Sequence, residues 1–334
     1  MIKIYKIVLF YIFKPQMSEK KRGIIIAAME RYEKLLISNI GYLRNRLKCS
    51  LPIEIWQIGQ EISDKAKEYL ELKQNEWNFT FKDVSHYTDD PEHWKGYQVK
   101  PFILKNTKFE EVILCDCDSL FLTNPEVIFD DKHYIETGTY FFKDYLLHIP
   151  KDAQEERNRM KFMQTLMPKP SRYLPEDCYY LYNIPTKKQQ LWFYQESGVV
   201  FLDKTRHPEV VDTIFKLNYN HKETYKYVHG DKETFWIAFL MHDKPFFMNE
   251  IPGLNFAPYF GMPRMIEEVK DGVEKSSLSF THLYIKDNKY IPFFSQKAYP
   301  DYDHITSKKV FEQLSKCPYY AQLFIGENAY VPGF

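Results

Sequence analysis

Short apolar runs alternate with amphipathic stretches from residue 23 onward, and this alternation constrains the fold more than any other feature. The first apolar run, residues 23–28, has the length and composition of a fully buried strand. The stretch behind it carries large apolar residues at helical spacing, namely Tyr32, Leu35, Leu36, Ile40, Leu43 and Leu47. Because a strand followed by a returning helix is the unit of parallel sheets, we expect an α/β fold with a mostly parallel central sheet.

The same alternation predicts the elements that follow. Strands are expected over 53–56, 79–84, 112–115 and 198–202, and helices over 63–74, 97–107 and 152–167, with a tyrosine-rich loop over 168–185. No repeat or low-complexity linker separates these elements. We therefore expect one domain over 23–300, a leader or edge segment over 1–22, and an extension packed on the domain over 301–334.

The charge balance excludes some classes of partner. Lys plus Arg equals Asp plus Glu at 45 each, so the chain has no overall basic field that would hold nucleic acid. The five cysteines are odd in number and scattered, without the paired spacing of a zinc site. This pattern favours a reducing compartment, and a cytoplasmic or membrane-associated location over secretion.

Residues 4–13 form an apolar stretch that is followed by Lys14 and by a basic cluster at 20–22. About ten residues are too few to cross the ~30 Å hydrocarbon layer as a helix. A truncated signal anchor or interfacial segment and an edge strand or leader are the two interpretations, so membrane association through this segment stays open.

Two carboxylates, Asp116 and Asp118, follow directly after the apolar run at 112–115. In an extended segment their side chains would project to the same face while Cys117 turns into the packing on the other. Ligands of open α/β sheets collect beyond the carboxyl ends of the strands, where this pair falls. Adjacent carboxylates repel, which a divalent cation or a proton between them relieves.

Three uses of such a pair are open at this point. The carboxylates could hold Mg²⁺ or Mn²⁺ on a nucleotide diphosphate, or they could simply end a strand in solvent. Alternatively Asp116 could be a phosphoaspartate nucleophile, as in haloacid-dehalogenase-type phosphohydrolases. In those enzymes the nucleophile strand usually comes first in the domain, whereas three strands are predicted before this one.

Several stretches then follow one another in a recognisable order: YQVKPF (97–102), FEEVILCDCD (109–118), TGTYFFKD (137–144), ESGVV (196–200) with Asp203-Lys204, and GDKETF (230–235). Together they resemble the fungal-type α-mannosyltransferases, a GT-A glycosyltransferase family distantly related to glycogenin-like enzymes. The resemblance runs from about Gly23 to about His282. It implies a Rossmann-like GT-A fold and a metal-dependent transfer of a hexose with retained anomeric configuration.

The resemblance also implies roles for the acidic pair. Asp116 and Asp118 match the DxD metal ligands of the family, and His282 is the candidate for a late third ligand. Carboxylates and neutral imidazole suit Mn²⁺, with Mg²⁺ as the alternative.

Further matches place residues around the donor. Lys100 would meet a phosphate or a nearby carboxylate, and Glu196 would be a nucleophile or a shield for an oxocarbenium-like centre. Gly198 would let the backbone approach the ligand closely. Asp231 would bind sugar hydroxyls, or merely cap a helix, and Lys232 would lie near phosphate.

The end of the first predicted strand would lie under the nucleotide. Small residues there permit a base or ribose to approach, which makes Ala27, Ala28, Glu30 and Arg31 the candidate contacts. The segments 255–264 and 290–300 match nothing in the family pattern, so the acceptor site is not predicted.

The expected partners are a nucleotide-sugar donor and a glycan or glycoprotein acceptor, and the most favoured reaction transfers mannose from GDP-mannose. A glucosyl- or galactosyltransferase that uses a UDP-sugar is the near alternative. A phosphohydrolase built on Asp116 and a non-catalytic sugar-nucleotide-binding homologue are the remote ones, because one fold and one metal clamp serve many specificities.

Overall fold

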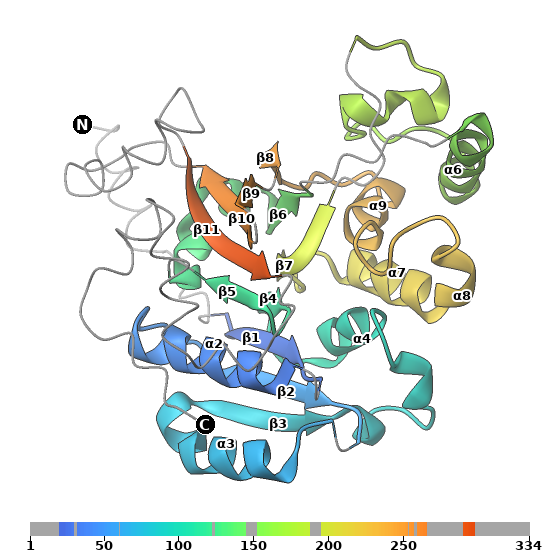
Figure 1. The fold of residues 1–334 in the computed structure, drawn as a ribbon. Coiled ribbons are helices and arrows are strands. Elements are labelled where there is room, and N and C mark those ends of the chain that lie inside the picture. The colour runs from blue at the N-terminus through green and yellow to red at the C-terminus, as the bar shows by residue number, and fades with distance from the viewer. Residues whose placement is uncertain are drawn as a thin grey trace, which may run out of the picture.

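A seven-stranded sheet forms the centre of the molecule, with the strand order β3-β2-β1-β4-β7-β6-β8 (Figure 1). The structure is a computed structural model and describes residues 20–29, 32–59, 61–121, 124–144, 152–187, 195–252, 254–256, 259–265 and 290–297. The strands of this sheet are β1 (Arg22–Ala27), β2 (Ile53–Gln57), β3 (Phe79–Asp83), β4 (Glu111–Cys115), β6 (Thr139–Lys143), β7 (Gln195–Asp203) and β8 (Met248–Pro252).

The sheet is mostly parallel, as the sequence predicts. β3, β2, β1 and β4 pair in parallel, and β6 pairs in parallel with β8. Only β7 runs against both of its neighbours, β4 and β6. The carboxyl ends of β1 and β4 therefore lie at the same edge as the amino-terminal end of β7.

Helices cover both faces of the sheet. They are α2 (Glu33–Asn45), α3 (Asp64–Trp77), α4 (Val99–Asn106), α5 (Lys132–Thr137), α6 (Ala153–Leu166), α7 (Pro208–Tyr219), α8 (His221–Thr224) and α9 (Thr234–Met241). Ser63 caps α3, since its hydroxyl accepts the backbone N–H of Ala66 at 3.3 Å. In Figure 1, α2 and α3 lie on one side and α4, α7 and α9 on the other.

Alternation along the central strands divides the core into two buried clusters. On β1, Ile25 packs with the residues of α4, α7 and α9, whereas Ile24 and Ile26 pack with those of α2 and α3. All three isoleucines are fully buried, and each such side chain contributes roughly 1.5–3 kcal/mol on burial. The strand is hydrophobic throughout because it is covered on both faces.

A second, antiparallel sheet was not predicted. Its order is β5-β11-β10-β9, with β5 at Ser119–Phe121, β9 at Leu254–Phe256, β10 at Tyr259–Met265 and β11 at Tyr290–Lys297. β11 pairs with β5, and Gln296 lies opposite Ser119. A segment far along the chain thus returns to the strand that directly follows the two aspartates.

The predicted elements in the first half are confirmed to within a few residues. The predicted strand at 198–202 is part of β7, which starts three residues earlier, and the predicted loop at 168–185 contains the 3₁₀ helix η5 (Glu176–Tyr182). Of the leader or edge segment predicted over 1–22, residues 1–19 with the apolar stretch at 4–13 lie outside the described residues, and Arg22 is the first residue of β1. The extension at 301–334 also lies outside the described residues. In the part of the chain that is described, no helix is both long and apolar enough to cross a bilayer.

Candidate active site

The two aspartates lie in a turn between β4 and β5. Strand β4 ends before Asp116, and the N–H of Ser119 donates to the carbonyl of Asp116 at 3.1 Å. The expectation of an extended segment is therefore wrong for this backbone. The two carboxylates are nevertheless close enough to interact, since Asp118 contributes to the raised pKa of Asp116.

The residue between the aspartates packs inward, as predicted. Cys117 is 4% exposed, and its thiol donates to the carbonyl of Ala27 at 3.0 Å. This bond places the end of β1, with Ala27 and the buried Ala28, beside the acidic turn. Contact of these two alanines with a nucleotide stays a prediction, and Glu30 and Arg31 lie outside the described residues.

An irregularity in β7 brings a second backbone segment to the acidic turn. Tyr140 of β6 pairs with Phe201 of the antiparallel β7, and Phe142 pairs with Glu196. Two steps along β6 thus correspond to five steps along β7, so β7 bulges between these pairs. Such bulges redirect side chains next to active sites. Within the bulge, the carbonyl of Gly198 accepts the N–H of Asp116 at 2.8 Å.

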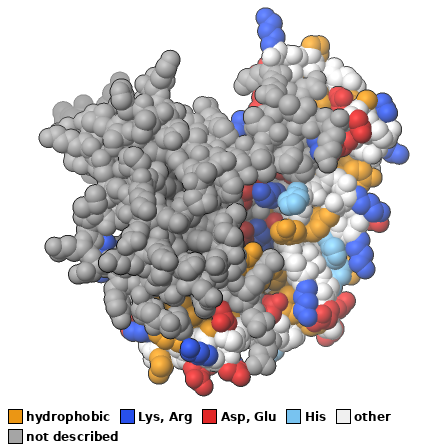
Figure 2. Space-filling view, viewed as in Figure 1, with side chains coloured by type: hydrophobic (Ala, Val, Ile, Leu, Met, Phe, Trp, Pro, Cys, Tyr) orange, Lys and Arg blue, Asp and Glu red, His pale blue; other side chains and the backbone are white. Residues whose placement is uncertain are grey.

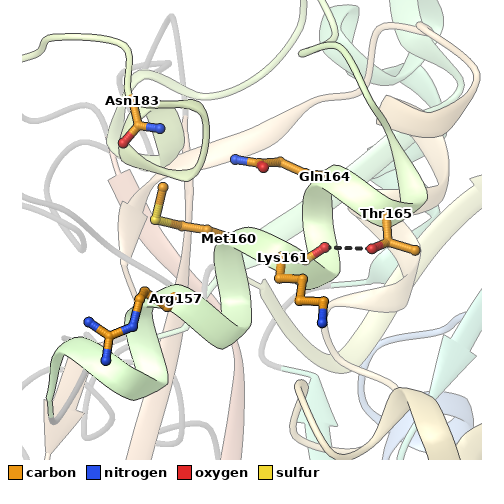
Figure 3. A pocket seen from close by; sticks show the side chains of 6 residues that line it. All are labelled: Arg157, Met160, Lys161, Gln164, Thr165 and Asn183. Carbon is orange, nitrogen blue, oxygen red and sulfur yellow. Dashed lines mark hydrogen bonds between the residues drawn. The ribbon is translucent and has the colours of Figure 1, made fainter.

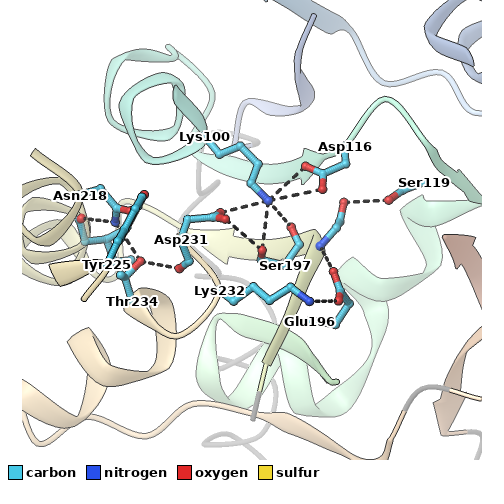
Figure 4. Close-up of polar contacts among 12 residues, drawn as sticks. Lys100, Asp116, Ser119, Glu196, Ser197, Asn218, Tyr225, Asp231, Lys232 and Thr234 are labelled. Carbon is cyan, nitrogen blue, oxygen red and sulfur yellow. Dashed lines mark hydrogen bonds and ion pairs between the residues drawn. The ribbon is translucent and has the colours of Figure 1, made fainter. Parts of the chain in front are cut away.

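Lys100 joins three segments at the centre of the site (Figure 4). Its ammonium lies 3.1 Å from Asp116 Oδ1 and 3.0 Å from Asp231 Oδ2. It also donates to the carbonyl and to the hydroxyl of Ser197, at 3.0 Å each. The residue is only 6% exposed, so it lies inside the protein among oxygens rather than on the surface. Of the two expected partners the structure shows the carboxylates, and contact with a phosphate stays a prediction.

Lys232 forms a second ion-pair centre next to the first. Its ammonium lies 2.6 Å from Glu196 Oε2 and 2.9 Å from Asp144 Oδ2. The other oxygen of Glu196 accepts the N–H of Gly198 at 2.8 Å. The Glu196 carboxylate is therefore fixed from two sides, by an ammonium and by the bulge backbone.

The electrostatics of Asp116 differ from those of an ordinary aspartate. Burial raises its pKa to about 7, and the negative charges of Asp118, Asp231 and Glu196 act in the same direction against the attraction of Lys100. Its side chain is still 29% exposed, so it forms the accessible edge of the cluster.

The pKa shifts of the other groups reflect pairing. Burial would raise the pKa of Glu196, but Lys232 outweighs it and holds that pKa below its usual value. Burial would lower the pKa of Lys100, but Asp116 and Asp231 hold it above its usual value. For Asp231, burial exceeds the effect of Lys100 and leaves the pKa raised. Four carboxylates thus contact two lysines, and with Asp118 beside Asp116 the cluster carries an excess of acid.

Comparison with known proteins assigns the chain to a family. Residues 21–264 match the family model Mannosyl_trans3, described as "Mannosyltransferase putative". The chain belongs to this mannosyltransferase family. The expectation drawn from the ordered sequence stretches is therefore confirmed.

Relatives of this chain include fungal proteins. It is 28% identical over 271 residues to "Putative alpha-1,3-mannosyltransferase MNN15" of Candida albicans, covering 68% of this chain and 34% of that protein. It is 27% identical over 276 residues to alpha-1,3-mannosyltransferase MNT3 of Saccharomyces cerevisiae, covering 76% and 43% respectively. The chain thus spans less than half the length of either relative. Among solved structures, the mannosyltransferase Ktr4p from S. cerevisiae in complex with GDP aligns with 12% identity and a TM-score of 0.45, covering 74% of this chain and 73% of that one.

Two of the predicted site residues differ in part from expectation. Glu196 is the second residue of β7 and so lies at the start of the strand, as expected, but its side chain is buried at 2% exposure where an open cleft position was expected. Asp231 precedes α9 by three residues, and Glu233 occupies the N-cap position. The carboxylate of Asp231 therefore does not cap the helix and instead contacts Lys100 and the hydroxyl of Ser197.

Sequence reasoning missed two members of the cluster, Asp144 and Ser197. Both occur in the ordered stretches, at the end of TGTYFFKD and inside ESGVV, so their positions were flagged without a role. What the sequence lacks is the contact between β6, β7 and the loop before α9, which is formed only in the folded chain.

The expected third metal ligand, His282, lies outside the described residues. Among the residues that are described, no three His, Cys, Asp or Glu side chains are grouped so as to hold a metal ion by themselves. Asp116 and Asp118 can thus offer two carboxylates from the described chain.

A pocket of about 390 Å³ lies away from this cluster (Figure 3). It follows α6 and the end of η5, and its lining residues are Arg157, Met160, Lys161, Gln164, Thr165 and Asn183. None of these belongs to the charged cluster. The candidate active site therefore consists of the cluster at the sheet edge and not of this pocket.

Proposed function

We propose that this chain, on a GT-A scaffold, transfers mannose from GDP-mannose to a glycan or glycoprotein acceptor, with retained configuration and with Mn²⁺ or Mg²⁺. The observation that supports the proposal is the cluster in which four carboxylates contact Lys100 and Lys232 at the carboxyl edge of the parallel strands, with Asp118 beside Asp116. In a mannosyltransferase family, such a cluster suits a ligand that carries both diphosphate and sugar hydroxyls.

The residues at the acidic turn fit a divalent cation. Mg²⁺ and Mn²⁺ are commonly held by one or two carboxylates together with substrate phosphates, and Asp116 and Asp118 offer that donor set. Burial, together with the neighbouring carboxylates, outweighs the attraction of Lys100 and raises the pKa of Asp116 to about 7, and a divalent cation would favour the ionised form. His282 would complete the ligand set. When bound, the cation would neutralise charge on the departing diphosphate.

The remaining groups of the cluster would bind and orient the donor sugar. Lys100 holds Asp116 and Asp231 in fixed positions, and Asp231 would accept hydrogen bonds from the hydroxyls of the donor sugar. Lys232 keeps Glu196 ionised, so that this carboxylate would stabilise positive charge at the anomeric carbon, as a nucleophile or as a shield. Lys232 itself is held between two acids, and its nearness to phosphate stays a prediction.

Thermal unfolding with Mn²⁺ and a panel of nucleoside diphosphates tests this function. We expect GDP to raise the Tm more than UDP or ADP, and we expect Asp118→Ala to remove the gain. Asp89→Ala, which changes an exposed aspartate outside the cluster, is the matched control and should keep it. A chain that responds to no nucleotide would contradict the transferase function, and a larger response to UDP would change the donor to a UDP-sugar.

A turnover assay separates the remaining alternatives. Hydrolysis of p-nitrophenyl phosphate that depends on Asp116 would favour a phosphohydrolase. Binding of GDP-mannose without hydrolysis or transfer would favour a non-catalytic binder.

A further inference from the structure

Two aromatic side chains lie together at the surface beside the charged cluster. Tyr97 is 55% exposed, which is unusual for a large apolar ring, and His229 is also exposed. Their ring centroids are 5.7 Å apart, with planes inclined by 51°. Figure 2 shows histidine and hydrophobic side chains side by side on the described face, next to basic and acidic ones.

The ring pair is connected to the cluster through the backbone of both segments. The carbonyl of Tyr97 accepts the N–H of Lys100 at 3.3 Å, and His229 comes two residues before Asp231. The Lys100 ammonium and Asp231 Oδ2 are 3.0 Å apart. Each segment thus contributes one ring at the surface and one charged group inside.

Gly230 fixes the position of the tyrosine. It adopts φ +63°, and a Cβ at this position would lie 2.7 Å from Cγ of Tyr97. The ring therefore packs directly on the glycine backbone, where any larger residue would displace it. An aromatic ring that is held rigidly and still exposed is suited to binding, because little side-chain entropy is lost when a ligand covers it.

We propose that Tyr97 and His229 form an acceptor subsite, in which the apolar face of a pyranose ring stacks on the two aromatic rings. This inference rests on the proposed function, whose acceptor site has no assigned residues. A nucleobase could also stack on such rings. However, the small residues expected to lie under the nucleotide, Ala27 and Ala28, end β1, whereas the ring pair belongs to the segments before α4 and α9. An acceptor sugar is the ligand that this position favours.

Steady-state kinetics with an α-linked mannobiose as the acceptor and GDP-mannose with Mn²⁺ as the donor test the subsite. Tyr97→Ala and His229→Ala should each raise the acceptor KM by about three- to tenfold, the range that aromatic stacking contributes. The donor KM should change less than the acceptor KM. Tyr97→Phe keeps the ring and should return the acceptor KM to within about twofold of wild type. Tyr219→Ala removes a ring of similar exposure, 53%, outside the pair and is the control.

The outcomes are distinct. An unchanged acceptor KM, or a donor KM that rises more than the acceptor KM, would overturn the subsite while leaving the transferase function intact. If the wild type does not turn over GDP-mannose, the proposed function fails, and saturation-transfer NMR with mannobiose alone still decides the subsite. A signal that is present in wild type and lost in Tyr97→Ala would support it, and no signal in wild type would overturn it.

Discussion

The two lysine centres of the site both pair an ammonium with carboxylates, but the pKa of the carboxylate is raised in one centre and lowered in the other. The side chain of Asp116, in the Lys100 centre, is 29% exposed, and its pKa is raised to about 7. The side chain of Glu196, in the Lys232 centre, is 3% exposed, and its pKa is lowered. One carboxylate shares its lysine with other acids and lies near solvent, whereas the other has an ammonium at 2.6 Å and a backbone N–H.

The contrast teaches that pairing, and not burial alone, decides the charge of a carboxylate here. Glu196 is the more deeply buried of the two and yet the more firmly ionised, because Lys232 is close to it. Pairs of titratable groups whose surroundings separate their pKa values usually have different roles in a reaction. We therefore propose that the Lys100 centre, here called the open centre, binds the cation, and that the Lys232 centre, called the closed centre, stabilises charge at the sugar.

The largest effect is expected from Glu196→Gln, which keeps the shape of the side chain and removes its charge. If this carboxylate stabilises the reacting sugar, the transfer rate should fall by about 10³-fold, as when one preorganised electrostatic group is removed. GDP and Mn²⁺ should still raise the Tm. Glu54→Gln changes another buried glutamate, on β2 and outside the cluster, and should keep the transfer rate. A rate within tenfold of wild type in Glu196→Gln would remove Glu196 from the chemistry.

Lys232→Met should give the largest loss of stability. It removes the ammonium from Glu196 and Asp144, whose side chains are both 3% exposed, and breaking a buried ion pair in this way costs about 3–5 kcal/mol. Urea unfolding measures the loss. Lys143→Met, which removes the longer 3.4 Å pair with Asp177, is the matched control and should cost less.

A double variant tests whether the unpaired charge of Glu196 causes the loss of stability in Lys232→Met. Lys232→Met combined with Glu196→Gln should recover part of the stability, because one of the two buried charges is gone. If the two changes are simply additive, the closed centre does not work as described.

Lys100→Met should be less damaging in the presence of a cation. The variant leaves Asp116 and Asp231 without the ammonium, but Asp116 is partly exposed and a divalent ion can reach it. We expect Mn²⁺ to raise the Tm of Lys100→Met more than that of wild type, whereas Lys232→Met gains no more than wild type. A concentration of 100 times Kd would contribute about 2.7 kcal/mol. Equal gains in the two lysine variants would remove the distinction between an open and a closed centre.

Local sequence pattern predicted the elements that place the open centre. The apolar run before Asp116, the helical spacing around α2 and the cap at Ser63 are all readable over a few residues, so the parallel half of the sheet followed from the sequence. The acidic pair and Lys100 were identified from the ordered stretches. The turn at 116–119 was not, because its backbone is held by a non-local hydrogen bond, from the N–H of Asp116 to the carbonyl of Gly198 on β7.

The closed centre could not be predicted because it depends on contacts between distant segments. Lys232 and Asp144 are 88 residues apart in sequence, and Lys232 and Glu196 are 36 apart. Neither separation leaves a periodic signal. The pairing of β5 with β11 is non-local in the same way, and the sequence of the β11 segment matched nothing that indicated a second sheet.

The smallest effect concerns the loss of stability in acid that comes from His207, which lies outside both lysine centres. This contribution must be known before the pH dependence of the two centres can be measured. His207 is 3% exposed and its ring nitrogen Nε2 lies 2.7 Å from the carbonyl of Thr137, while burial lowers its pKa. Below its ordinary pKa of about 6.5, the unfolded chain therefore binds a proton that the folded chain resists, so stability falls as the pH falls through that value. The loss from one such group cannot exceed about 1.4 kcal/mol per pH unit.

In His207→Gln, whose amide can still donate to Thr137, the free energy of unfolding between pH 7 and 5.5 should fall less steeply than in wild type. An unchanged slope would assign the acid sensitivity to the carboxylates and lysines of the cluster instead, and would make the pH dependence a direct measure of the difference between the two centres.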